Sequence, residues 1–69
     1  MHHFTLNKYY MKSSELNKLI LQNGWKAIRQ RGSHVTYEKD GIRYTATFHG
    51  SKEVGKGLAS KIIKEMELK

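Results

Sequence analysis

Proton transfer near neutral pH is a chemistry that this sequence could supply, and it would rest on histidine. An imidazole with its ordinary pKa of about 6.5 can accept or donate a proton. His34 follows a Gly-Ser pair and begins a segment in which Val35 and Tyr37 share one face, so its ring should point to the opposite, exposed face. A solvated histidine at a strand end is the alternative. His49 is a candidate second proton carrier, or else a turn residue beside a glycine.

Basic residues lie near both histidines. They are Lys26, Arg29 and Arg31 before the first, and Lys52 and Lys56 after the second. The last two should lie at the start of a helix, where unpaired backbone N–H groups and the helix dipole also favour an anion, so all five are candidate phosphate ligands. An ordinary solvated charged surface is the alternative.

The net charge points to a polyanionic partner. The 69 residues include 13 Lys and Arg against 6 Asp and Glu, which gives a formal charge of +7. Such a field attracts nucleic-acid phosphates, although acidic proteins and membrane surfaces attract basic proteins as well. A chain this short forms one domain without a deep cavity, so any chemistry should take place on an exposed face.

Several classes of function are excluded by what the sequence lacks. It contains no cysteine, which rules out disulfides, thiolate metal sites and a cysteine nucleophile. No His, Asp and Glu cluster has metal-ligand spacing, and no glycine-rich phosphate loop follows a strand, so neither a metal nor a small-molecule cofactor is predicted. No apolar run approaches the roughly 20 residues that span a bilayer, and no signal peptide is evident. We therefore expect a cytoplasmic protein without membrane contact.

Two segments have the apolar spacing of amphipathic helices, 14–23 and 56–68. Ser13 or Ser14 should cap the first helix, and Gly24 should close it in a left-handed conformation. Trp25 follows directly and is expected in the core.

Three strands are predicted between the helices, at 25–31, 34–38 and 42–49. Asp40 and Gly41 have the turn chemistry of a two-residue hairpin. The last strand should direct its alternating apolar residues to the core, on the same side as Tyr37. These residues are Ile42, Tyr44, Ala46 and Phe48.

The expected fold is α+β, in the order helix, three antiparallel strands, helix. Both apolar helix stripes need cover, and a single sheet with both helices packed on one face satisfies that need. Residues 1–10 show neither helical nor strand periodicity and are expected to be an extension of a domain spanning 11–69, with Met11 as the alternative start.

This order is that of double-stranded-RNA-binding domains, and an ordered set of short motifs resembles the HicA toxin family. The set comprises the Met-Lys-Ser helix start at 11–16, Gly-Trp at 24–25, Arg-Gln-Arg-Gly-Ser-His at 29–34, and His-Gly-Ser-Lys-Glu-Val at 49–54. The resemblance covers about 11–68. It departs at 46–48, where the family commonly has a proline before the second histidine.

The resemblance implies an endoribonuclease toxin, an mRNA interferase, with His34 as its catalytic histidine and a HicB-type antitoxin covering that surface. Ribonucleases that work without a metal commonly let the substrate's 2′-hydroxyl attack the adjacent phosphate, which requires a proton acceptor, a proton donor and positive charge. Two alternatives stay open. One is a non-catalytic RNA-binding module of the same fold, and the other is a small domain whose basic face docks an acidic protein.

Overall fold

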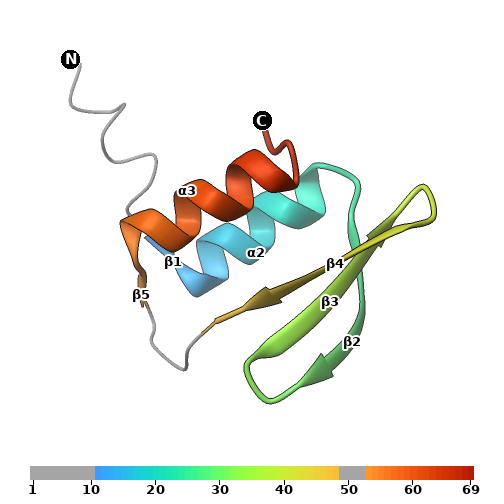
Figure 1. Ribbon diagram of the computed structural model, residues 1–69, viewed down its shortest axis with the longest axis horizontal. Coiled ribbons are helices and arrows are strands. Elements are labelled where there is room, and N and C mark those ends of the chain that lie inside the picture. Colours follow the sequence, from blue (N-terminus) through green and yellow to red (C-terminus); the bar gives the residue numbers. More distant parts are fainter. Residues whose placement is uncertain (1–10, 49–52) are drawn as a thin grey trace.

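The computed structural model describes residues 11–48 and 53–69 and has two layers, a sheet and a pair of helices (Figure 1). Residues 1–10, the predicted extension, lie outside the described residues. The elements are β1 (Met11–Lys12), α2 (Ser13–Gln22), β2 (Lys26–Arg31), β3 (His34–Lys39), β4 (Ile42–Thr47), β5 (Glu53–Val54) and α3 (Lys56–Glu65). The predicted α+β fold and its order of helix, three strands and helix are confirmed.

The main sheet is antiparallel, in the order β2-β3-β4, and two tight turns fix its register. Asp40 and Gly41 both have positive φ, at 51° and 81°, which is the type I′ geometry that matches the twist of paired strands. Gly32, with φ 57°, begins the turn between β2 and β3. The predicted hairpin is thus confirmed, and β2 joins β3 through a second two-residue turn.

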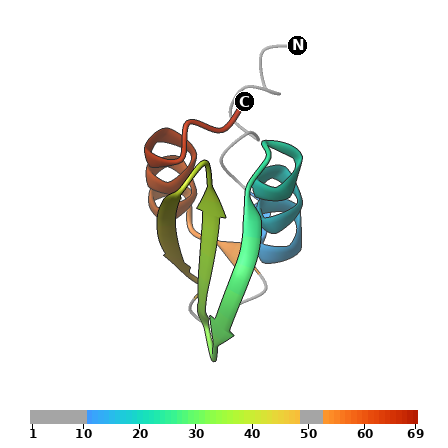
Figure 2. The same ribbon diagram turned by 90° about the vertical axis from the view of Figure 1, so that its right-hand side faces the viewer.

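Both helices cover the same face of this sheet, while no helix of residues 11–48 and 53–69 lies over the other face (Figure 2). The core between the layers includes four fully buried side chains, Tyr37, Leu16, Ile20 and Ile62. Trp25, Val35 and Ala46 are also buried, whereas Tyr44 and Phe48 are half-buried against this cluster. The predicted core face of the strands is confirmed except at Ile42.

Each helix is joined to a strand by a tyrosine hydroxyl. Tyr37 of β3 donates to Asn17 Oδ1 of α2, and Tyr44 of β4 donates to Glu65 Oε1 of α3, both at 2.5 Å. Burial raises the pKa of the Tyr37 phenol. Tyr44 has its pKa raised to about 12, first by burial and then by the hydrogen bond and the negative charge of Glu65. Both contacts therefore involve the protonated phenol.

A second, two-stranded sheet was not predicted. β1 pairs antiparallel with β5, with Met11 opposite Val54 and Lys12 opposite Glu53. Strands of two residues have too few positions to show a period, so only the tertiary pairing reveals them. The small sheet connects the starts of both helices, because β1 runs directly into α2 and β5 precedes α3 by one residue.

The helix termini differ from the prediction by a few residues. Lys12, not Ser13 or Ser14, is the N-cap of α2, and its backbone N–H donates to the Glu15 carboxylate at 2.8 Å. The predicted stop is confirmed, because Gly24 has φ 93° one residue after the C-cap. α3 ends at Glu65 rather than at residue 68, since the chain turns at Glu67, whose φ is 55°.

Two strand predictions are also corrected. Trp25 precedes β2 rather than beginning it, although it is buried as expected. Ile42 is 63% exposed. Ile42 pairs with Lys39 next to the hairpin turn, and Figure 1 shows this turn projecting past the helices that would otherwise cover it.

Neither helix in the described part of the chain is long and apolar enough to cross a membrane.

Candidate functional site

His34 lies exposed at the first position of β3, on the face of the sheet that the helices leave uncovered. Val35 and Tyr37 point into the core, and strand alternation therefore turns His34 and Thr36 outward. The backbone N–H of Phe48 donates to the Ser33 carbonyl at 2.8 Å, which extends the pairing of β3 with β4 up to the turn. The predicted exposure of His34 is confirmed.

Cross-strand pairing places further polar residues on this side of the sheet. Residues directly opposite one another in an antiparallel sheet share a face, with Cβ atoms about 4.5–5.5 Å apart. The pairing therefore defines an open face of nine residues in three rows. They are Arg31, His34 and Thr47; Arg29, Thr36 and Thr45; and Lys26, Glu38 and Arg43.

The open face is strongly cationic. Its four basic side chains, Lys26, Arg29, Arg31 and Arg43, are all exposed, against the single carboxylate of Glu38. Arg31 is the cross-strand neighbour of His34 on one side, and Thr47 is its neighbour on the other. An imidazole flanked by a guanidinium and a hydroxyl can bind a phosphate diester and move a proton beside it.

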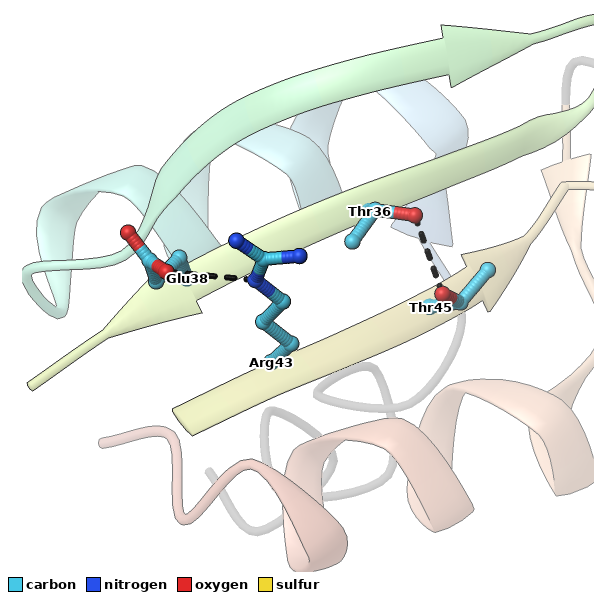
Figure 3. Close-up of polar contacts among 4 residues, drawn as sticks. All are labelled: Thr36, Glu38, Arg43 and Thr45. Atoms are coloured by element: carbon cyan, nitrogen blue, oxygen red, sulfur yellow. Dashed lines mark hydrogen bonds and ion pairs between the residues drawn. The ribbon is translucent and has the colours of Figure 1, made fainter. Parts of the chain in front are cut away.

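Two polar contacts join β3 to β4 on the open face, as Figure 3 shows. Thr36 Oγ1 and Thr45 Oγ1 are 3.0 Å apart, and Arg43 Nε donates to Glu38 Oε2 at 3.2 Å. A shallow hollow of about 360 Å³ lies over this part of the sheet, lined by Ile28, Arg29, Thr36, Glu38 and Arg43. The hollow begins one row away from His34 and continues toward the far row.

The structure separates the predicted phosphate ligands into groups. Arg31 and Arg29 lie in the first and second rows, close to His34. Lys26 pairs with Glu38 in the third row, about 13 Å along the strand from the histidine, so it does not flank the turn. Lys56 is the first residue of α3 and has an interaction partner of its own. His49 and Lys52 lie outside the described residues.

The roles of Arg43, Glu38 and the threonines on the open face were not predicted from the sequence. Their place on one face could have been predicted, because a two-residue turn at Asp40 and Gly41 fixes which residues of β3 and β4 lie opposite one another. The register of β2 against β3 could not be predicted from its turn alone. Its register shifts between Ala27 and Arg29, where Ile28 is the additional residue of a β-bulge.

Within residues 11–48 and 53–69, no three His, Cys, Asp or Glu side chains lie close enough together to hold a metal ion. The chemistry that the described side chains of the open face can offer is thus proton transfer by an imidazole, charge stabilisation by guanidinium groups, and hydrogen bonds from hydroxyls.

The fold and the open face define a class, the small basic α+β domains with two helices behind a three-stranded sheet. The chain matches the profile of a family described as "HicA toxin of bacterial toxin-antitoxin" over residues 13–68. A relative from Pseudomonas fluorescens (strain Pf0-1), named "Probable mRNA interferase HicA", is 34% identical over 59 residues, which cover 86% of this chain and 98% of the relative. The chain belongs to the HicA toxin family, as its motifs indicated. No solved structure matches it significantly.

Proposed function

We propose that this protein cleaves RNA on the open face of its sheet, with His34 as the catalytic proton carrier. The general class, an endoribonuclease toxin, follows from its membership of the HicA family, and the related protein carries the name mRNA interferase. The single observation that supports the site is the exposure of His34 on a cationic sheet face beside Arg31.

The proposed reaction uses the substrate's own 2′-hydroxyl. Its oxygen forms a bond to the adjacent phosphorus, its proton leaves, and the bond from phosphorus to the 5′-oxygen breaks as that oxygen gains a proton. The His34 imidazole carries one of these two protons, and Arg31 stabilises the charge that develops on the phosphorane oxygens. The products are a 2′,3′-cyclic phosphate and a 5′-hydroxyl. His49 is the remaining histidine candidate for the second proton transfer.

Cationic side chains position the RNA around this centre in the proposed complex. Arg29 and Arg31 bind the phosphates nearest to the cleaved bond, and Lys26 binds one farther along the strand. Lys56 contributes from the first residue of α3, where backbone N–H groups add to the positive potential, and Lys52, outside the described residues, is kept as a candidate phosphate ligand from its sequence position. Phosphate contacts of this kind fix the position of RNA with little sequence preference.

We further propose that a HicB-type antitoxin restrains the toxin by covering His34. No helix in the described part of the chain covers the face that holds this histidine, so a bound protein can block RNA without changing the fold (Figure 2). A patch that is mainly cationic favours an acidic contact surface on that partner.

The decisive experiment compares wild type with His34→Ala and His34→Gln on an RNA substrate in excess chelator. Wild type should cleave and leave cyclic phosphate ends, whereas both variants should lose about 10²- to 10⁴-fold in rate and still bind RNA. Fluorescence of Trp25, the one tryptophan of the chain, checks that the variants fold. Undiminished cleavage by either variant would remove His34 from the mechanism, and an inactive wild type that retains RNA would favour the non-catalytic module.

A further inference from the structure

We infer that the third row of the open face, centred on Arg43, is a second binding point for the phosphate backbone of the RNA substrate, remote from the cleaved bond. The inference rests on the proposed function, because it concerns the same substrate. It assigns a role to Arg43 and to Glu38, and it makes the sheet itself a path along which the RNA strand lies.

Geometry gives the first argument. The row of Lys26, Glu38 and Arg43 is four residues along β3 from His34, which corresponds to about 13 Å. A duplex strand carries one phosphate per about 3.4 Å of helix axis, so a point this far from His34 meets a phosphate other than the one at the cleaved bond. The hollow of about 360 Å³ over the second and third rows is open to a strand that leaves the His34 row along the sheet.

The charge of the open face favours a phosphate backbone as the ligand of the third row. The third row holds two cations and one carboxylate, and with Arg29 and Arg31 the open face has four cations. Among the described residues Arg43 donates to Glu38 through Nε alone, and its side chain is 69% exposed. Its terminal guanidinium nitrogens therefore remain available to bind a phosphate oxygen, while the Glu38 carboxylate holds the side chain on the sheet.

This arrangement predicts opposite effects for the two partners of one ion pair. Arg43→Gln removes a phosphate ligand and should weaken RNA binding by about threefold to fivefold. Glu38→Gln removes a negative charge from the same path, so it should strengthen binding by a similar factor. Loss of a merely structural ion pair would not change affinity in opposite directions.

The test measures binding of wild type and variants to an RNA with 2′-O-methyl groups, which lack the attacking hydroxyl and stay intact. Lys61→Gln is the matched control, because Lys61 is an exposed lysine on α3 and lies outside the open face. Arg43→Gln should lower the log–log slope of affinity against salt by about 0.7, the value for one phosphate of a single strand. Lys61→Gln should leave the slope unchanged.

The outcomes separate this inference from the proposed function. If His34→Ala still cleaves RNA normally, the catalytic proposal fails whatever Arg43 does. If cleavage requires His34 but Arg43→Gln and Lys61→Gln have equal effects on RNA affinity, or if Glu38→Gln weakens binding, the second binding point does not exist. An effect of Arg43→Gln on antitoxin binding alone would make the third row a protein interface and would equally overturn the inference.

Discussion

The position of one imidazole depends on the backbone of the two residues before it. His34 begins β3 directly after the turn in which Gly32 has φ 57°, and the Ser33 carbonyl accepts a hydrogen bond from Phe48. A left-handed φ at the first central position of a two-residue turn is what brings β2 back alongside β3 and places Arg31 opposite His34. The conformation of Gly32 therefore helps to keep Arg31 next to His34.

Gly32→Ala should destabilise the protein by about 1–2 kcal/mol and lower kcat for RNA cleavage. A Cβ at this position meets no atom within 4 Å, so the cost is that of the left-handed backbone alone. Gly57→Ala is the matched control. It lies in α3 at a negative φ with equally free space, and it should stabilise the protein by about 0.5–1 kcal/mol without affecting kcat.

Urea unfolding followed by Trp25 fluorescence gives both free energies of unfolding, and cleavage is compared where each variant is folded. Equal changes in stability for the two glycine variants would show that the turn does not require a left-handed residue at position 32.

The secondary-structure elements are held together by contacts that the sequence predicts only in part. Apolar spacing predicted both helices and the core face of β3 and β4, because those periods arise from burial itself. The tyrosines on that face were correctly assigned to the core, but their hydroxyl contacts with Asn17 and Glu65 depend on how the helices lie across the sheet. No pattern within either helix indicates them.

The candidate site, too, could be predicted from the sequence only in part. The exposure of His34 and the cationic character of β2 follow from local alternation and composition, whereas the location of Lys26 in the third row depends on the bulge at Ile28. A bulge changes the register by one residue and is not encoded in a periodic pattern. The sequence alone thus predicted the types of residue at the site. The structure was needed to show which of them lie opposite one another in each row of the open face.

At the level of packed elements, Tyr44 should make stability depend on pH in the alkaline range. Its pKa is raised to about 12 in the folded protein, above the ordinary value of 10.0, so the folded state favours the protonated phenol. The stabilisation is fully present below about pH 10 and is lost as the pH rises toward 12. Tyr44→Phe should therefore lose stability less steeply than wild type across this interval.

The measurement is the free energy of unfolding at several pH values between 9 and 12, together with the ultraviolet absorbance of phenolate. Glu65→Gln is a second variant that keeps the phenol but removes the neighbouring charge. It should lower the pKa of Tyr44 only in part, because burial is the larger cause. Parallel pH profiles for wild type and Tyr44→Phe would contradict the assignment.

The molecule as a whole has a small core without covalent reinforcement. The chain has no cysteines, and a single core in a domain of this size rarely supplies more than about 3–5 kcal/mol. Ile62 is 1% exposed, and its replacement by Ala should cost about 2–5 kcal/mol, enough to unfold much of the population.

Ile42→Ala is the control for this substitution, because the same side chain is removed where it is 63% exposed. Its effect should stay within about 0.5 kcal/mol. Thermal unfolding of both variants distinguishes the two environments. A similar Tm for the two would mean that the core between sheet and helices is not the main source of stability.

The distribution of charge over the whole molecule predicts how RNA binding responds to salt. The net charge is +7, and the open face contributes four exposed cations to it. If each of the four neutralises one phosphate of a single strand, the log–log slope of affinity against salt should be at least about 3 in magnitude, since each contact contributes about 0.7. Binding of 2′-O-methyl RNA at several salt concentrations measures this slope. A value below about 1 would indicate that the cations act only as a diffuse field, because a surface that orients RNA across three rows must release counterions at each of them.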